Sequence, residues 1–282
     1  MTLLKQIKIA LTGASGFIGS HISREAGQIV VIDRNDSEDV ICEKLKDVDV
    51  VINLAGAPII KRWTKAYKDV LVSSRINTTR KLVRAVNDSS VSHFISTSAT
   101  GIYPDNTECD ETCPSLSDDF LGKLAAKWEE EALKCTKKTT IFRLGVVLGK
   151  EGGALKKMLL PFRLGLGGPI GDGSMVMSWI DICDLVRMYA FAIDNKLSGV
   201  FNAVSPRLVT NKEFAKELGK VLKRPAFIPV PAFMLKLIFG QAASVLTASK
   251  IVYPKRALQE GFSFLYPDIS ASLNHILLDK SR

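Results

Sequence analysis

One stretch near the start of the chain, Ile7-Lys8-Ile9-Ala10-Leu11-Thr12-Gly13-Ala14-Ser15-Gly16-Phe17-Ile18-Gly19, joins a short apolar run to three regularly spaced glycines. The apolar run predicts a buried strand, and the glycines have the spacing of a turn that opens a helix. In such a turn Gly13 allows the tight reversal, Gly16 leaves room for a pyrophosphate, and Gly19 lets the helix pack closely. The helix N-terminus adds free N–H groups and a positive dipole. The residues predicted to hold a dinucleotide are Gly13, Ser15, Gly16, Phe17, Ile18 and Gly19.

A second apolar run, Ile29 to Ile32, ends twenty residues after Gly13 at Asp33-Arg34, where the adenosine ribose of a bound dinucleotide is expected. Asp33 would accept hydrogen bonds from the ribose hydroxyls and repel a 2'-phosphate, which favours NAD. Arg34 would pair with that phosphate, which favours NADP. The two residues favour different cofactors, so NADP and NAD both remain open at this point, together with a simple solvated role for Arg34.

Strands and helices alternate through the first half of the sequence, which predicts an α/β fold. We expect a Rossmann-like, doubly wound parallel sheet with helices on both faces. The expected strands after the first two are Asp47–Leu54, His93–Ser96 and Thr139–Leu148, and the expected helices are Ser20–Ala26, Thr64–Val86 and Asp118–Leu133, the last capped by Asp118 or Asp119.

The pattern changes at Gly149, after which glycines punctuate a loop-rich stretch. We therefore predict a dinucleotide-binding domain over residues 1–149 and a smaller C-terminal substrate or cap domain over residues 150–282. Residues 176–205 are expected to return to the first domain. The expected elements here are strands at Val176–Ile182 and Gly199–Ala203 and helices at Asp184–Ile193, Thr210–Leu222 and Ala232–Thr247. The last helix is interrupted by Lys236 and Gly240, so it is expected to pack as core or cap and not to span a membrane.

The composition, 46% hydrophobic and 24% charged residues, is typical of a soluble globular protein. The N-terminal apolar run leads into the glycine turn without a cleavage site, so we predict no signal peptide. Five scattered cysteines suggest reduced thiols in a cytoplasmic protein. The three histidines lie far from Cys109 and Cys113 in the sequence, so we predict no metal site.

The formal charge is +9, and the stretch from Arg207 to Arg256 contains ten Lys or Arg residues against only Glu213 and Glu217. The basic residues stand singly among apolar ones, without the clusters or interleaved aromatics of a nucleic-acid surface. We expect a solvated face, and as the alternative a field that attracts an acidic small-molecule substrate. Neither nucleic acid nor a membrane is an expected partner.

Several further stretches carry a family resemblance. They are Asn53-Leu54-Ala55-Gly56, Lys61-Arg62-Trp63, Ser73-Ser74-Arg75, Met177-Ser178-Trp179-Ile180 and the run from Arg224 to Pro231. Together with the glycine turn they resemble the extended short-chain dehydrogenase/reductases, and within them the epimerase-family proteins of the YfcH type. The resemblance implies cofactor contacts at Leu54, Ala55, Gly56 and Arg75. It also favours NADP over NAD, because related members have an arginine at the place of Arg34, although Asp33 departs from their pattern. Some members of that subgroup carry the label "cell division inhibitor", which implies a protein partner.

The chemistry of that superfamily needs a tyrosine that transfers a proton, a lysine four residues later that lowers the tyrosine pKa, and a serine that orients the substrate oxygen. Ser98 matches the serine, but Phe120 and Leu124 stand at the tyrosine and lysine spacing. Lys123 would point about 100° away on a helix. Tyr103 could supply a hydroxyl to the same pocket, or be an ordinary half-buried tyrosine.

Ser98 and Tyr103 are therefore the predicted catalytic residues. The sequence leaves open whether the protein is an NAD(P)-dependent oxidoreductase or epimerase, or a catalytically silent dinucleotide sensor.

Arg75 stands where extended family members often have asparagine, on the nicotinamide side of the cofactor. A fixed cation there could hold an anionic substrate or a cofactor phosphate, or form a structural ion pair. The resemblance also implies positions near the cleft for Trp63 and Trp179, although large apolar residues more often lie in a core. Asp181 replaces an expected histidine.

Overall fold

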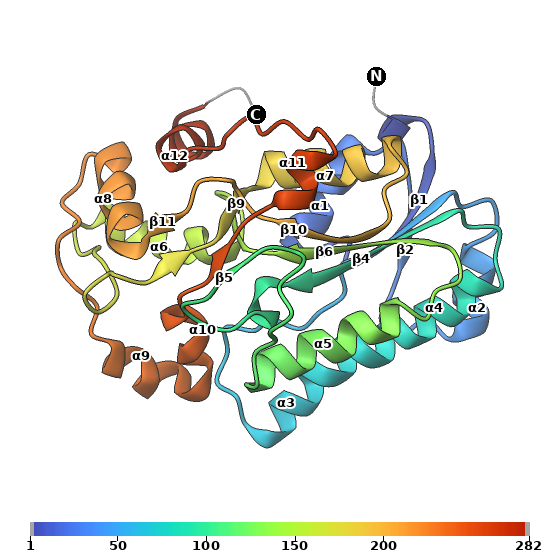
Figure 1. Ribbon diagram of the computed structural model, residues 1–282, viewed down its shortest axis with the longest axis horizontal. Coiled ribbons are helices and arrows are strands. Elements are labelled where there is room, and N and C mark those ends of the chain that lie inside the picture. The colour runs from blue at the N-terminus through green and yellow to red at the C-terminus, as the bar shows by residue number, and fades with distance from the viewer. Residues whose placement is uncertain (1–2, 280–282) are drawn as a thin grey trace.

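A six-stranded parallel sheet forms the middle layer of the protein, seen in a computed structural model that describes residues 3–279 (Figure 1). Across the sheet the strands run in the order β2-β1-β3-β4-β6-β10. Their bounds are β1 Lys8–Thr12, β2 Gln28–Ile32, β3 Val50–Asn53, β4 His93–Ala99, β6 Lys138–Leu144 and β10 Gly199–Ala203. Every neighbouring pair is parallel.

Helices cover both faces of this sheet, as Figure 1 shows. One face is covered by α1 (Phe17–Glu25) and α7 (Ile182–Asp194), and the other by α2 (Glu38–Lys44), α4 (Thr78–Asn87) and α5 (Phe120–Ala132). Each interface buries its own apolar cluster, so the strands are apolar on both faces, as expected for a parallel sheet. The predicted Rossmann-like α/β fold is confirmed.

The strand order reverses between β1 and β3, because β2 lies on one side of β1 and all later strands lie on the other. In open α/β sheets a ligand binds at such a switch point, beyond the carboxyl ends of the strands. The turns that follow β1 and β3 contain Gly13 and Leu54, and the backbone of Leu54 is in contact range of Gly13. The topology therefore creates the crevice between the two turns that the sequence assigns to the cofactor.

Two elements differ from the sequence prediction. The expected strand Thr139–Leu148 is broken at Gly145 into β6 and β7 (Val146–Leu148), and β7 leaves the main sheet to pair with β9 (Trp179–Asp181). The expected helix Thr64–Val86 consists of α3 (Lys65–Val72) and α4 joined by a π-helical turn, Ser73–Asn77. Single π turns within α-helices occur frequently at functional sites.

The smaller part of the protein lies beyond the carboxyl end of the sheet, on the left of Figure 1. Its elements are α6 (Gly153–Arg163), β8 (Val176–Met177), β11 (Val209–Thr210), α8 (Asn211–Leu222), α9 (Ala232–Phe239) and α10 (Ser244–Thr247). Thr210 begins α8 with a capping box to Glu213. The expected single helix Ala232–Thr247 is divided at Gly240, which has a φ of 58°.

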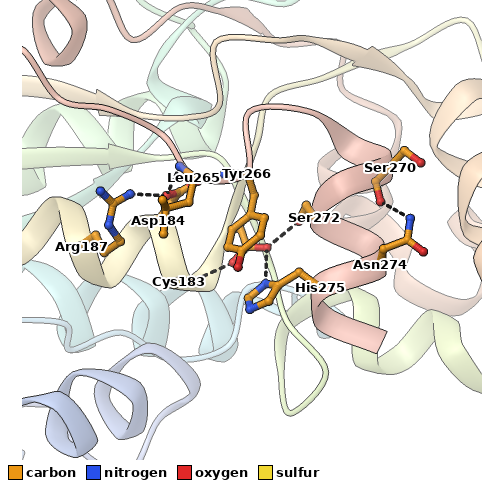
Figure 2. Close-up of polar contacts among 10 residues, drawn as sticks. Cys183, Asp184, Arg187, Leu265, Tyr266, Ser270, Ser272, Asn274 and His275 are labelled. Carbon is orange, nitrogen blue, oxygen red and sulfur yellow. Dashed lines mark hydrogen bonds and ion pairs between the residues drawn. The ribbon is translucent and has the colours of Figure 1, made fainter. Parts of the chain in front are cut away.

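The C-terminal segment crosses back to the large sheet. β12 (Ile251–Val252) pairs with β5 (Glu108–Cys109), and α11 (Lys255–Gln259) and α12 (Ile269–Leu278) follow. Figure 2 shows the chain at Leu265 and Tyr266 docked onto α7: both backbone N–H groups donate to the carboxylate of Asp184 at 2.8 Å. Asp184 is fully buried and also binds Arg187, so this carboxylate ties the C-terminal segment to the dinucleotide-binding part.

Cys109 and Cys113 are joined by a disulfide, so the expectation of reduced thiols is wrong for this pair. The turn after β5 brings the two residues together, with a Cα–Cα distance of 5.2 Å.

Between Leu3 and Asp279 no helix is both long and apolar enough to cross a membrane. In the same range no group of three or more histidine, cysteine or acidic side chains could hold a metal ion.

Candidate dinucleotide and substrate site

The turn after β1 has the geometry that a pyrophosphate requires. Gly13 has a φ of 67°, and a Cβ at Gly19 would lie 2.2 Å from the Gly13 carbonyl oxygen, so glycine is needed at both positions. Helix α1 begins at Phe17, and its N-cap residue Gly16 offers no side-chain cap. Several other helices, α6, α9 and α11 among them, also lack a side-chain cap. What distinguishes α1 is that its N-terminus follows β1 at the switch point of the sheet, so its amides are placed for an anionic ligand.

A buried threonine fixes this turn against the turn after β3. Thr12 Oγ1 donates to Asn53 Oδ1 at 2.8 Å and accepts from the backbone N–H groups of Leu54 and Ala55. Because these contacts satisfy the amides internally, the two turns keep one relative position. The predicted cofactor residues Leu54, Ala55 and Gly56 consequently stand beside the glycine turn.

Phe17 contributes to the site through packing. A Cβ at Gly149, Gly152 or Gly153 would lie within 3.3 Å of the Phe17 ring, so the ring packs directly on the glycine-rich stretch that follows β7. This stretch begins where the sequence pattern changes. The side chain of Phe17 thus fixes the start of α1 and leaves its backbone N–H at the ligand side.

Asp33 and Arg34 follow β2 and are both exposed. Asp33 Oδ1 accepts from the backbone N–H of Asn35 at 2.9 Å, which keeps its carboxylate within its own turn. Two lysines from other elements bind this turn. Lys81 donates to the carbonyls of Arg34 and Asp36, and Lys44 forms an ion pair with Asp36. Sequence reasoning missed Lys81, because it lies 47 residues from Arg34 and reaches it only through the packing of α4.

A cavity of about 250 Å³ adjoins the crevice at the carboxyl ends of β3 and β4. Its polar lining side chains are Arg75, Thr97, Ser98 and Trp128. Thr97 already bonds the hydroxyl of Tyr189 at 2.8 Å, and the indole N–H of Trp128 donates to Thr79 at 2.8 Å. Among the described lining residues, Arg75 and Ser98 are therefore the groups left to recognise a polar ligand.

Helix α5 presents an apolar face to this cavity. The α5 residues that line it are Leu121, Leu124, Ala125 and Trp128. Phe120 packs instead against Trp63, with ring centroids 5.4 Å apart, and Lys123 is exposed on the other side of the helix. The face that carries the proton-transferring pair in the resembled superfamily is here a hydrophobic wall.

Ser98 is bonded to a buried ion pair on the side away from the cavity. Its Oγ donates to Glu129 Oε1 at 2.6 Å, and Arg143 binds both oxygens of Glu129, Nε at 2.8 Å and Nη2 at 2.7 Å. Ser98, Glu129 and Arg143 are each less than 10% exposed. Since the paired carboxylate has only lone pairs to offer, the Ser98 proton is directed to Glu129, and the lone pairs of Ser98 Oγ remain as its acceptor sites.

Tyr103 does not reach the cavity, which contradicts its predicted catalytic role. The side chain is fully buried, and its hydroxyl donates to Asn202 Oδ1 at 2.9 Å and accepts from Arg143 Nη1 at 2.7 Å. Burial raises the pKa of the Tyr103 phenol, although the Arg143 guanidinium opposes this. The turn after β4 (Thr100–Ile102) carries Tyr103 behind Ser98, so its hydroxyl binds Arg143 and is not among the groups that line the cavity.

Arg75 lines the cavity from the π-helical turn and is only 7% exposed. It donates to neutral acceptors, the carbonyls of Ala57 at 3.0 Å and Leu71 at 3.4 Å, and lies over the Trp128 ring. No carboxylate in the described chain pairs with it, so the expected alternative of a structural ion pair is wrong. Burial without a counter-ion lowers the Arg75 pKa to about 10.

Trp179, expected near the cleft, and Asp181, which replaces an expected histidine, both make structural contacts. Trp179 is fully buried in the apolar cluster that also contains Leu155 and Phe214. Its indole N–H donates to the Arg207 carbonyl at 3.0 Å. Asp181 begins α7 as its cap and accepts from Ser272 Oγ at 2.7 Å. Burial raises the Asp181 pKa. Neither residue lines the cavity, and the contacts of both hold the fold together.

The comparisons with known proteins give consistent results along the chain. Residues 9–203 match the NAD dependent epimerase/dehydratase family, and residues 230–276 match a domain of unknown function. The chain is 36% identical to the epimerase family protein SDR39U1 of Mus musculus, covering 96% of this chain and 100% of that protein. It is 34% identical to the epimerase family protein YfhF of Bacillus subtilis, covering 97% and 99% of the two chains.

A solved structure extends the likeness to three dimensions. The crystal structure of human SDR39U1 (isoform 2) with NADPH has a TM-score of 0.90 to this chain at 33% identity. It covers 97% of this chain and 100% of the human one.

Proposed function

The chain belongs to the NAD dependent epimerase/dehydratase family, and from this we propose that it binds NADP(H) and oxidises a hydroxyl-bearing carbon of a small molecule, or reduces the corresponding carbonyl. The observation that carries the proposal is the uncapped N-terminus of α1 at the β1/β3 switch point, beside a cavity that contains Ser98. The crystal structure of the human relative holds NADPH.

The choice of NADP over NAD rests on the turn after β2. Arg34 is exposed there, and the Lys81 ammonium lies beside it at the Arg34 carbonyl. Two cations at the adenosine end favour a 2'-phosphate. The Asp33 carboxylate, which would oppose the phosphate, accepts from the backbone of its own turn.

Proton transfer in this proposal runs through Ser98 and Glu129 instead of a tyrosine. A bound nicotinamide would supply hydride exchange. Ser98 lines the cavity and its Oγ lone pairs are its acceptor sites, so it accepts a hydrogen bond from a substrate hydroxyl. As the carbinol is oxidised, its hydroxyl proton moves to Ser98 Oγ and the Ser98 proton moves to Glu129 Oε1. Reduction follows the same path in reverse.

Arg143 acts as a positioning residue in this scheme. Its two bonds to Glu129 hold the carboxylate at Ser98, and Tyr103 and Asn202 hold the guanidinium from behind. Hydrogen bonding and charge from Glu129 raise the Arg143 pKa, even though its burial acts in the opposite direction. Glu129 therefore keeps a fixed orientation toward Ser98 through the reaction.

The second candidate function is a catalytically silent NADP(H) sensor that acts through a protein partner. The apolar cavity face of α5 favours it, because that face offers no titratable group to a substrate. The narrower resemblance to YfcH-type proteins, some of which carry a cell-division label, also favours this second candidate. A cytoplasmic location suits both candidates.

Dinucleotide binding is tested by the thermal shift that NADPH produces. We expect a rise in Tm for the wild type and none for Gly16→Val, because the added side chain fills the space intended for the pyrophosphate. Gly16→Val should fold, since its Cβ meets only the Gly13 carbonyl at 3.1 Å. A wild type that responds to none of the four nicotinamide dinucleotides would contradict both candidates.

The two candidates are separated by turnover. The NADPH-loaded protein is mixed with ketones, aldehydes and nucleotide sugars, and oxidation is followed by the absorbance of the reduced nicotinamide. Turnover that disappears in Ser98→Ala supports the oxidoreductase. Silence across the panel, with tight NADPH binding, supports the sensor.

A further inference from the structure

The cavity beside Ser98 contains a second polar group that the proposed proton path does not use, the guanidinium of Arg75. Residues of the 13–19 turn are absent from its described lining, so the cavity lies apart from the turn assigned to the pyrophosphate. No aspartate or glutamate of the described chain lines it either. Arg75 is therefore the only charged side chain among the described residues that line the cavity. Burying a cation without a counter-ion is unfavourable unless a ligand supplies the negative charge.

The donors that Arg75 has left are arranged for a carboxylate. Of its five N–H groups, two on Nη1 point to the Leu71 carbonyl and to Ser74 Oγ, and one on Nη2 points to the Ala57 carbonyl. The Nε–H and the second Nη2–H remain. Nε and an Nη nitrogen together are a pair through which arginine binds a carboxylate with two parallel hydrogen bonds.

Gly56 keeps the guanidinium accessible. A Cβ at this position would lie 2.9 Å from Nη2, 3.0 Å from Cζ and 3.3 Å from Nε of Arg75. Gly56 is exposed and lines the same cavity. These distances place such a Cβ over one face of the guanidinium and not in its plane, so the absence of a side chain leaves that face uncovered.

The position of Arg75 is fixed from the other sides. It belongs to the π-helical turn Ser73–Asn77, its guanidinium carbon lies 5.3 Å from the centre of the Trp128 ring, and the Ala57 carbonyl holds Nη2. An arginine held by three neutral contacts loses little further freedom when it binds an anion. The cavity therefore has two fixed polar ends, the Ser98 lone pairs and the Arg75 fork, separated by apolar walls.

We propose that this cavity is a subsite for a hydroxy acid or its oxo acid, with the carboxylate on Arg75 and the reacting oxygen at Ser98. The proposal rests on the proposed function, because it names the substrate class of that same site. It identifies the ligand by its chemistry alone: a carboxylate anion on a short carbon chain that bears a hydroxyl or carbonyl group.

The test uses the full-length protein saturated with NADPH, in which a hydroxy acid can bind but cannot be oxidised. Glycolate, lactate and 2-hydroxyhexanoate are titrated by calorimetry, each against its uncharged amide. We expect at least one acid to bind about tenfold or more tightly than its amide, as a charge-assisted pair of hydrogen bonds implies. This comparison is made in the wild type, so it does not depend on the folding of any variant.

Variants then assign the effect to the guanidinium. Arg75→Gln should abolish the preference for the acid, and Arg75→Lys should keep part of it. Gly56→Ala should reduce acid binding, because its Cβ would press on the face of the guanidinium and displace Arg75. Arg84→Gln is the matched control, because this arginine lies on the adjoining helix, is largely exposed and does not line the cavity. It should bind like the wild type.

The outcomes separate this inference from the proposed function. If NADPH binds but every acid binds no better than its amide, or Arg75→Gln keeps the preference, the carboxylate subsite is wrong and dinucleotide binding stands. If inorganic phosphate binds more tightly than every hydroxy acid, the carboxylate subsite is also wrong. If NADPH itself does not bind, the proposed function fails first.

Discussion

Ser98 Oγ lies 2.6 Å from Glu129 Oε1, and both atoms are shielded from solvent between β4 and α5. The two residues are 31 positions apart in the sequence. In the proposed reaction this carboxylate is the proton acceptor, because the helix face toward the cavity is apolar. The energetic and chemical consequences of this contact can be measured directly.

Glu129→Gln should destabilise the protein by about 3–5 kcal/mol, because it leaves the buried Arg143 guanidinium without its counter-charge. Tyr103→Phe removes only the hydroxyl behind Arg143 and should cost about 1–3 kcal/mol. Urea unfolding of both variants measures the two free energies. A loss for Glu129→Gln no larger than that for Tyr103→Phe would show that the ion pair contributes little.

Gly19→Ala should lower stability by about 1–3 kcal/mol, because its Cβ would lie 2.2 Å from the Gly13 carbonyl oxygen and force the turn to move. The same movement should weaken NADPH binding at least about tenfold. Gly101→Ala is the control for stability, since its Cβ would find only Leu121 at 3.8 Å. Thermal unfolding with and without NADPH gives both quantities, and equal behaviour of the two variants would contradict the role of the Gly13–Gly19 contact.

Arg34→Ala should weaken NADPH binding about tenfold or more and leave NADH binding nearly unchanged, because only NADPH carries the 2'-phosphate. Lys81→Ala should have a smaller effect in the same direction, since Lys81 also holds the backbone of this turn. Arg24→Ala serves as the control, because Arg24 lies on α1 and its side chain pairs with Glu151. Calorimetry measures the affinity of each variant for both dinucleotides. If Arg34→Ala lost affinity for NADPH and NADH equally, Arg34 would not contact the phosphate.

His93 should make the fold sensitive to mild acid. It is 4% exposed and bonded to Thr140 at 2.8 Å, and burial together with the charge of Lys138 lowers its pKa from 6.5 to about 4. The unfolded chain therefore binds a proton at a higher pH than the folded one does. Stability should fall as the pH drops from about 6.5 to about 4, by up to about 3 kcal/mol.

The measurement is the urea midpoint of unfolding across that pH range, for the wild type and for His93→Gln. The variant should start less stable at neutral pH and lose less on acidification, because it has no imidazole to protonate. An unchanged slope in His93→Gln would assign the acid sensitivity to other groups.

The sequence alone determined the parts of this protein whose cause is local. The glycines of the 13–19 turn are required by backbone conformation and by contacts within a few residues, and Asp119 and Thr210 cap their helices through adjacent amides. Alternation of strands and helices then predicts a parallel sheet, and the sheet order confirms it. The switch-point crevice follows from that alternation as well.

Only the tertiary structure decided the chemistry of the site. Tyr103 is near Ser98 in the sequence but is carried behind it, whereas Glu129 reaches Ser98 from another element and Arg75 is left without a counter-ion. The sequence also could not reveal that β7 leaves the sheet at Gly145, because apolar residues continue across the break. Periodicity reports which residues are buried, but the partner of a buried polar group is set by which elements pack against each other.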